Sequence, residues 1–276
     1  MSCRTTILDD ISILYSEAMS STYNPTRRNR NIGTSKQGHG QNNRMVIPQL
    51  FASHHGSTAQ IGPHEKLVRE VNGKRITFIV EHPNNEFLHA CSVEDVIFML
   101  SHIPSADLMW LDTFVFRQST RKTRIINPAW GRLYYLANLT FSPRRTRRSG
   151  PAIFLEACKV NDVFKWSTSQ DREDGNELER LRADGHDIDR IGGNYIISTR
   201  IDAVRSTQLY RTLLHEIGHW VDWLERVETR NGDFSELLDL YFARPENERE
   251  AFAHHYADRW QKILRNKGII PFDRIG

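Results

Sequence analysis

The chain has 276 residues, of which 39% are hydrophobic and 26% are charged, and its formal net charge at pH 7 is +3. This length allows one large domain with its own core. No run approaches the ~20 consecutive apolar residues of a membrane-spanning helix, so we expect no membrane partner. The three cysteines, Cys3, Cys91 and Cys158, are too far apart for a Cys-x-x-Cys metal site, and their odd number argues against a disulfide framework.

The N-terminal region is predicted to be an extension, residues 1–45, that is partly disordered. A short amphipathic helix is expected over 7–18, and residues 20–43 are rich in Ser, Asn, Arg and Gly. The first residues lack the charged-then-apolar layout of a secretory signal. We therefore expect synthesis in the cytoplasm. Export by a route that needs no secretory signal is the alternative.

Residues 46–276 are expected to form one compact unit, beginning with a strand-rich subdomain over 46–160. β-branched and aromatic residues predict strands over 75–80, 108–116, 132–137 and 152–155. A helix is predicted over 96–101, with Ser92 as its N-cap. Residues 143–150, which contain four arginines, are predicted to form a basic hairpin-like turn.

Charge is segregated along the chain. Residues 113–155 contain no Asp or Glu and nine Lys or Arg, whereas in residues 161–190 the nine Asp and Glu outnumber the five Lys and Arg. Such asymmetry can attract a charged partner, so the basic region 117–148 is a candidate contact for an anionic molecule. Alternatively, the basic and acidic segments are both ordinary solvated surfaces, or they face each other in the folded protein.

The second half of the unit, residues 161–276, is predicted to be the metal-bearing core. It starts with a polar, acidic insertion over 161–193, which we expect to be a flap with a short helix over 176–183. A strand is predicted over 194–199 and a long helix over 203–227. An edge of that strand would suit an extended peptide, which binds through main-chain hydrogen bonds.

The long helix carries the motif His-Glu-x-x-His, at His215, Glu216 and His219. Residues four apart lie about 40° from each other around an α-helix, so both imidazoles can bind one ion. Imidazole is a common ligand of zinc, and we expect one Zn²⁺ as cofactor. Glu216 would lie beside the ion and accept a proton from the water bound there. The alternative is that the two histidines face solvent or an ion pair.

A catalytic zinc ion normally has three protein ligands and one open position. Glu225, six residues after His219, lies roughly 240° further round the helix, so we discount it. Asn231 and Gly232 are expected to end the metal helix, and a short helix is predicted over 235–242.

The last predicted helix runs from Pro245 to about residue 265 and offers acidic residues to the ion. Glu250 and Glu248 compete as the third ligand, with Glu246 the weakest candidate. Small residues would let this helix pack closely against the metal helix as an antiparallel neighbour: Ala251, Ala253 and Ala257.

Residues 213–257 resemble short-spaced gluzincin peptidases, the family of the anthrax lethal factor catalytic domain. The shared patterns are His-Glu-x-Gly-His-x-Val-Asp from His215 and Asn-Glu-x-Glu-x-Phe-Ala from Asn247. The resemblance implies a zincin-like α+β fold, in which a small, mostly antiparallel sheet packs against the His-Glu-x-x-His helix and a second C-terminal helix bears the Glu ligand. It favours Glu250 over Glu248 as that ligand. Metallopeptidases that cleave repressors are a second, similar group.

The resemblance also implies a tyrosine that stabilises the transition state. Tyr241 is the nearest counterpart, although it lies two residues further from Glu250 than in the family, and Tyr256 is the second candidate. Asp222 is expected to orient a ligand or a neighbouring loop, and His254 to contact a ligand or the substrate.

We therefore expect a zinc-dependent metalloendopeptidase that acts on a protein or peptide, with Glu216 as general base. The alternative is a zinc-containing nucleic-acid-binding or regulatory protein, of the repressor-cleaving type, that uses its basic strands and tail. A combination of both is a peptidase that recognises an acidic or nucleic-acid-associated protein through its basic face.

Overall fold

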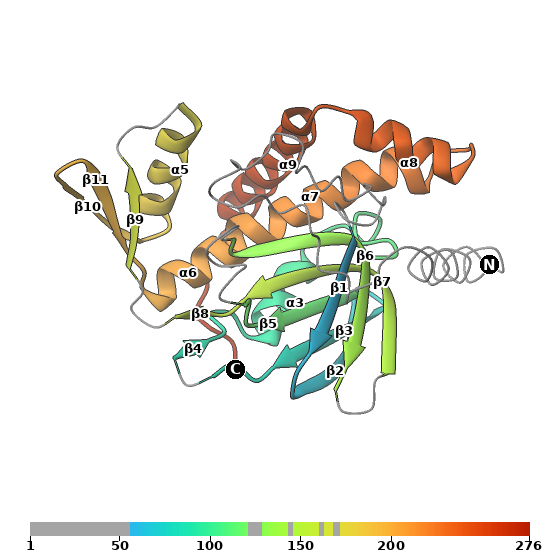
Figure 1. Ribbon diagram of the computed structural model, residues 1–276, viewed down its shortest axis with the longest axis horizontal. Coiled ribbons are helices and arrows are strands. Elements are labelled where there is room, and N and C mark those ends of the chain that lie inside the picture. Colours follow the sequence, from blue (N-terminus) through green and yellow to red (C-terminus); the bar gives the residue numbers. More distant parts are fainter. Residues whose placement is uncertain (1–55, 85, 121–128, 143–145, 160–162, 168–171) are drawn as a thin grey trace, which may run out of the picture. The chain divides into compact units, whose positions relative to one another are not determined.

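A computed structural model describes residues 56–276 except 85, 121–128, 143–145, 160–162 and 168–171 (Figure 1). The predicted extension, its helix over 7–18 and the loop over 20–43 lie outside the described residues. Thr58–Gly276 form one compact unit. Among the described residues, none of the helices combines the length and the apolar character needed to cross a membrane.

The main sheet has six strands in the order β1-β6-β7-β5-β3-β2. Its strands are β1 (Gly56–Ile61), β2 (His64–Val71), β3 (Lys74–Glu81), β5 (Thr113–Arg117), β6 (Gly131–Phe141) and β7 (Thr146–Glu156). β5 runs parallel to β3 because helix α3 (Val93–Ser101) connects them as a crossover. Five of the seven described pairings in the protein are antiparallel, so the expected α+β class with mostly antiparallel pairing is confirmed.

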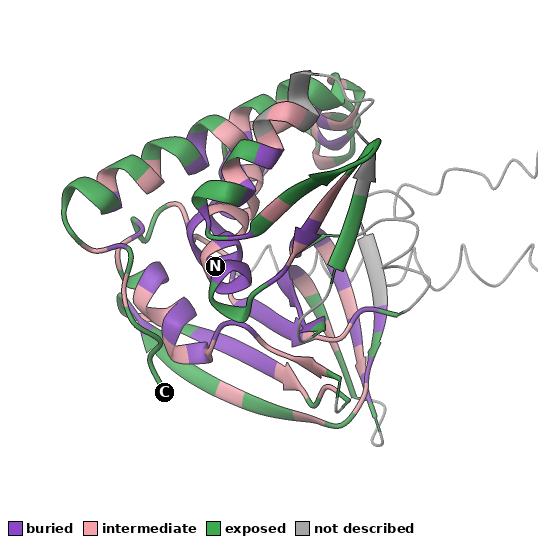
Figure 2. Ribbon diagram, turned by 90° about the vertical axis from the view of Figure 1, so that its left-hand side faces the viewer, coloured by how far each residue is buried: buried purple, intermediate pink, exposed green. Residues whose placement is uncertain are grey.

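Alternate residues of the central strands face two different cores, as the two-residue period of a strand requires. Phe78 and Phe114 pack towards the helices, whereas their neighbours Ile79 and Val115 pack on the opposite face of the sheet. Figure 1 shows α7 and α9 on one side of the curled sheet. Figure 2 shows the same division, with buried residues on the inner sides of the helices and exposed residues outside.

Residues 163–198 form a folded module beside the sheet, which we call the α5 module. It consists of β9 (Val163–Ser167), α5 (Arg172–Ala183), β10 (Asp187–Ile191) and β11 (Asn194–Ser198), with the strand order β10-β11-β9. Leu178, Leu181 and Ile197 form its small core. The described part of the predicted insertion over 161–193 therefore contains α5 and two strands, β9 and β10, of a three-stranded sheet. The predicted strand over 194–199 is central in that sheet, so the expectation that its edge binds a peptide is wrong.

The remaining strand predictions were partly correct. Residues 108–111 form turns rather than a strand, and Trp110 has a φ of 65°. Leu108 and Leu111 are nevertheless buried, because this segment closes the α3–β5 connection over the core. Residues 146–150 belong to β7, and the tip of the predicted basic turn lies outside the described residues. A two-stranded pair, β4 (Phe87–Leu88) with β8 (Cys158–Lys159), was not predicted.

The metal helix is a continuous helical run with two wide turns. It comprises α6 (Ile201–Thr207), the π-helical turn η1 (Gln208–Thr212), α7 (Leu213–Trp223) and a second π-helical turn, η2 (Leu224–Glu228). The run was predicted over 203–227. α8 (Phe234–Ala243) and α9 (Glu246–Asn266) follow, close to their predicted bounds. Pro245 is the N-cap of α9 rather than its first helical residue.

Candidate metal centre

The candidate site lies where α7 and α9 come into backbone contact. A Cβ added at Gly218 would be only 2.9 Å from the Ala253 Cα and 3.0 Å from the Tyr256 Cβ. Glycine at position 218 therefore permits the close approach. Ala253 and Ala257 are buried, as predicted for this contact, whereas Ala251 is exposed.

Successive contacts show that the two helices are antiparallel. The Gln261 amide of α9 donates to the Tyr210 carbonyl at the start of the run, and the His254 ring lies 4.4 Å from the His215 ring between centroids. Glu250, one turn earlier on α9, lies beside His219. This arrangement confirms the predicted antiparallel neighbour of the metal helix.

Glu250 bridges the two histidines. Its Oε2 lies 3.2 Å from the His215 Nε2, and its Oε1 lies 3.4 Å from the His219 Nε2. Two ligand atoms ~2.05 Å from a tetrahedral zinc ion are about 3.3 Å apart. Each separation is close to that value, with a different Glu250 oxygen facing each histidine. All three donor atoms lie within 4.8 Å of one another. Two imidazoles and a carboxylate are also a donor set that zinc accepts, so these residues fit the ion.

Hydrogen bonds within the cluster favour the ionised form of Glu250 and the protonated form of His219. Burial raises the pKa of Glu250, but hydrogen bonds with His215 and His219 outweigh it and hold the pKa well below its usual value. Burial lowers the pKa of His219, but the hydrogen bond with Glu250 and the charge of Glu216 reverse the shift and raise it. Glu250 is therefore ionised, as a ligand must be.

Glu248 does not belong to this cluster. Its side chain is more than half exposed and lies 3.7 Å from the Arg244 guanidinium. Glu225 is exposed on η2, as expected for a residue discounted as a ligand. Among the described residues, the only group of three or more metal-ligand side chains is His215, His219 and Glu250.

Glu216 lies beside the cluster and is held by the main sheet. Its Oε2 accepts a hydrogen bond of 2.6 Å from the Leu133 N–H of β6. Both Glu216 and His215 line a cleft of about 230 Å³. The backbone of β6 thus fixes one oxygen of a carboxylate that lines the cleft.

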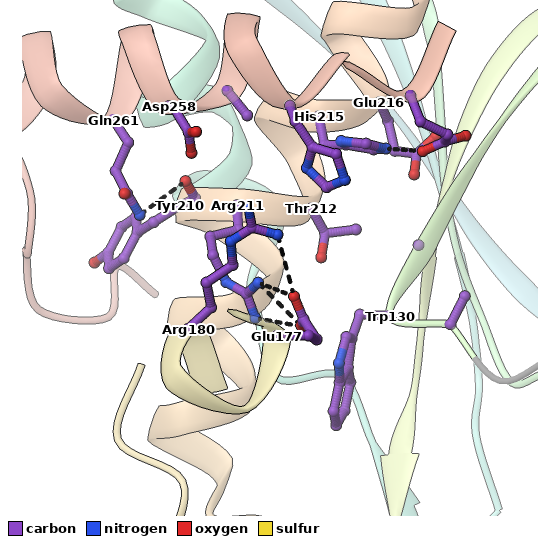
Figure 3. A pocket seen from close by; sticks show the side chains of 15 residues that line it. Trp130, Glu177, Arg180, Tyr210, Arg211, Thr212, His215, Glu216, Asp258 and Gln261 are labelled. Carbon is purple, nitrogen blue, oxygen red and sulfur yellow. Dashed lines mark hydrogen bonds and ion pairs between the residues drawn. The ribbon is translucent and has the colours of Figure 1, made fainter. Parts of the chain in front are cut away.

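The cleft extends from the metal ligands to the α5 module (Figure 3). Its walls come from the start of β6, the metal helix, α9 and α5. The residues that line it are Ala129, Trp130, Gly131, Glu177, Arg180, Tyr210, Arg211, Thr212, His215, Glu216, Glu250, His254, Ala257, Asp258 and Gln261.

The first half of β6 has an edge that no strand of the described residues covers. The Trp130 carbonyl accepts a hydrogen bond from the Glu156 N–H, so by alternation the main-chain groups of Gly131 and Leu133 point away from β7. β1 has six residues and ends beside Ser142, so it lies along only the second half of the eleven-residue β6. The uncovered edge is next to Glu216.

The π-helical turn η1 joins the metal helix to the sheet. The buried Gln208 donates to the carbonyl oxygens of Trp130 and Glu156, at 2.9 and 2.7 Å. A Cβ at Gly131 would lie 2.8 Å from the Thr212 side chain, so η1 also touches β6 closely. Single π turns are frequent at functional sites. Sequence reasoning missed Gln208, because nothing local distinguishes it from other polar residues on a helix.

The structure does not support either tyrosine as a catalytic group. Tyr241 is 1% exposed, and its hydroxyl bonds to the Tyr135 hydroxyl at 3.0 Å. The Tyr256 hydroxyl donates to Asp107 at 2.7 Å. Burial raises the pKa of both phenols. Neither residue lines the cleft, and both have packing roles between elements.

Asp222 and His254 have different surroundings. Asp222 is fully buried and accepts hydrogen bonds of 2.7 Å from Arg226 and Arg244, so it orients the segment that leads into α9. His254 lines the cleft beside His215. Burial lowers the pKa of His254, as do the charges of His215 and Arg180, so its imidazole is neutral at pH 7.

Two arginines of the basic region are engaged in ion pairs. Arg117 bonds to the buried Glu156 at 2.9 Å, and Arg148 bonds to Asp112 at 2.8 Å. Their partners lie within the main sheet and at the start of β5, not in the acidic segment 161–190. Residues 121–128 and 143–145, which hold five of the nine basic residues, lie outside the described residues.

The fold and the site together define an α+β protein with a candidate His-His-Glu metal centre in a cleft. No family model, curated protein or solved structure matches the chain. The case for its function therefore rests on the geometry of its own residues.

Proposed function

We propose that this chain is a zinc-dependent endopeptidase with a zincin-like fold. The observation that carries the proposal is the separation of 3.2 and 3.4 Å between the Glu250 oxygens and the two histidine Nε2 atoms, in a cleft that also contains Glu216. A zinc ion bound there would act as a Lewis acid and bring the pKa of a water molecule towards ~7.

Glu216 is the proposed general base. The Leu133 N–H holds one of its oxygens, and the second oxygen accepts a proton from the attacking water. The same carboxylate then delivers that proton to the leaving amine. His254, a neutral imidazole beside His215, faces the cleft and can donate a hydrogen bond to the peptide carbonyl.

The uncovered edge of β6 supports a peptide as the substrate. An extended chain can pair with the main-chain groups of Gly131 and with the Leu133 carbonyl, as in other cases of strand addition, whereas the Leu133 N–H is bound to Glu216. Such pairing would position a peptide bond next to Glu216 without dependence on side chains. This edge replaces the strand over 194–199, whose two edges are both paired.

The nucleic-acid-binding alternative has less support. Arg117 and Arg148, at the two ends of the basic region, are already paired with carboxylates. A repressor-cleaving peptidase would use the same metal ligands and the same base, so it differs from our proposal only in its substrate.

Metal analysis tests the ligand set. We expect one zinc ion per chain in the purified wild type and in Glu248→Ala, and a loss of bound zinc in Glu250→Ala. Glu248 is the matched control because it has the same charge and lies on the same helix outside the cluster. Equal zinc content in all three proteins would refute the assignment of Glu250.

Replacement of the proposed base tests the chemistry. Glu216→Gln should retain zinc but cleave a casein substrate roughly 10²–10⁴-fold more slowly, which is the usual contribution of a general base. Cleavage by this variant at the wild-type rate would overturn the role of Glu216.

A further inference from the structure

Two arginines line the cleft where α5 meets the metal helix, Arg180 of α5 and Arg211 of η1, and their environments differ. Arg211 lies between two carboxylates, with bonds of 2.9–3.1 Å to both oxygens of Glu177 and a further bond to Asp184. Its side chain is 18% exposed. The donors of Arg211 are therefore occupied by the protein itself, and its role is to attach α5 to the metal helix.

Arg180 has no comparable partner among the described residues. Within the described part of the chain, its only ion pair is with Glu177, where the Arg180 Nη1 lies 3.6 Å from the Glu177 Oε2. This distance is too long for a strong hydrogen bond. Glu177 is, moreover, already bound by Arg211. The Arg180 side chain is 35% exposed and lines the cleft. Figure 3 shows it rising from α5 towards the end of the cleft where His215 lies. Its guanidinium can therefore donate to a ligand.

We propose that Arg180 binds a carboxylate of the substrate on the α5 side of the metal ligands, and so selects peptides that carry an acidic group at that position. The inference rests on the proposed peptidase function. A guanidinium presents parallel N–H donors that match the two oxygens of a carboxylate. The carboxylate belongs to an Asp or Glu side chain, or to the C-terminus of a short peptide.

The opposite wall reinforces this selection. Asp258 of α9 is exposed and lines the cleft opposite α5 (Figure 3). A substrate carboxylate is therefore repelled from the α9 wall and attracted to Arg180. Arg211 and Arg180 together balance the charges of Glu177 and Asp184, so the attraction depends on the N–H donors that Arg180 directs into the cleft.

The experiment compares two charge reversals on the same helix. Arg182 is exposed on α5 and does not line the cleft, so Arg182→Glu is the matched control for Arg180→Glu. The zinc-loaded proteins are incubated with a positional library of fluorogenic peptides, each made with an amidated and with a free C-terminus. Cleavage rates then give the preference at each position.

We expect the wild type and Arg182→Glu to prefer Asp or Glu over Lys at one position by roughly tenfold or more, the effect of a charged hydrogen bond. Arg180→Glu should lose this preference and favour Lys or Arg there. A preference in amidated peptides identifies a side chain, and a preference only in free acids identifies the C-terminus. An unchanged profile in Arg180→Glu would overturn the inference.

A binding measurement separates this inference from the proposed function. Fluorescence anisotropy of the same peptides with zinc-loaded Glu216→Gln reports recognition without cleavage. Acidic preference in binding, lost in Glu216→Gln combined with Arg180→Glu, would support the carboxylate site even if the wild type cleaved no peptide. Cleavage by the wild type without acidic preference in either assay would refute the carboxylate site and leave the hydrolase.

Discussion

Two regions border the cleft, and they are attached to the metal helix by different forces. α9 meets α7 through backbone contact at Gly218 and Ala253, with buried apolar residues around it. The α5 module is attached mainly through polar groups, in which Glu177 and Asp184 bind Arg211, and Asp184 also binds Thr207. Close packing depends on atomic fit. The Arg211–Glu177 pair is partly exposed and is therefore weak and sensitive to salt, whereas the Asp184 side chain is buried.

This difference indicates that the α7–α9 contact and the α5 module have separate roles. The α7–α9 contact fixes the positions of His215, His219 and Glu250, which tolerate little movement if they are to hold an ion. The α5 module supplies Arg180 and one wall of the cleft, which can move or vary without disturbing the ligands. The predictions below test these separate roles, beginning with the largest expected effect.

Removal of Asp222 should damage the α7–α9 region most. Asp222→Ala leaves Arg244 and Arg226 without their buried partner, and we expect a loss of about 3 kcal/mol in the free energy of unfolding. Urea denaturation monitored by circular dichroism measures the loss. Glu225→Ala, an exposed acid nearby, should change stability by less than about 0.5 kcal/mol. Similar losses in both variants would contradict this role of Asp222.

The same substitution in the two regions should have opposite effects. Gly218→Ala forces α7 and α9 apart, which should cost about 1–3 kcal/mol and weaken zinc binding. Gly175→Ala lies in α5 with no atom within 4 Å of the new methyl group, so it should stabilise the protein by up to about 1 kcal/mol. Thermal unfolding and zinc titration measure both. Equal effects would remove the distinction between the regions.

Breaking the attachment of the α5 module should have a smaller and local effect. Glu177→Gln removes the charge that binds Arg211, and we expect a loss of about 1 kcal/mol or less in global stability. Hydrogen exchange should become faster in α5 but not in α7 or α9. Added salt should shrink the difference from the wild type. Faster exchange throughout α7 would show that the module is part of the metal framework.

A pH effect should distinguish the module's junction from the rest of the chain. Burial lowers the pKa of His186, whose Nε2 contacts the Thr207 hydroxyl. The folded protein then binds fewer protons than the unfolded chain just below pH ~6.5, so this contribution to stability is lost as pH falls. His186→Asn should flatten the fall of unfolding free energy between pH 7 and 5. If the unfolding free energy fell equally steeply with pH in the wild type and in His186→Asn, this role of His186 would be wrong.

The sequence predicted the features that depend on local pattern. The His-Glu-x-x-His spacing, the Ser92 capping box and the α9 helix each follow from residues close together in the chain, and each is present. The preference for Glu250 over Glu248 came from a motif resemblance. The structure places Glu250 with His215 and His219.

Other features depend on distant residues and left no local signal. β2 is an edge strand with mostly exposed charged residues, so it lacks the alternation that identifies a half-buried strand. Residues 108–111 look like a strand because they are apolar, but their burial comes from a turn packed on α7. No local pattern identifies Arg180 as a ligand-binding residue, because its availability depends on the pairing of Arg211 with Glu177.

The wide turn η1 has a further consequence for the register of the whole run. A π turn accommodates one extra residue, so side chains beyond it are rotated by about 100° relative to an unbroken α-helix. Converting Gln208–Thr212 to regular α-helix without changing its length would therefore swing both imidazoles away from Glu250, whereas deleting one residue there would leave them nearly in place. The direction in which His215 and His219 point is thus set by a wide turn that lies upstream of the motif and contributes no ligand itself.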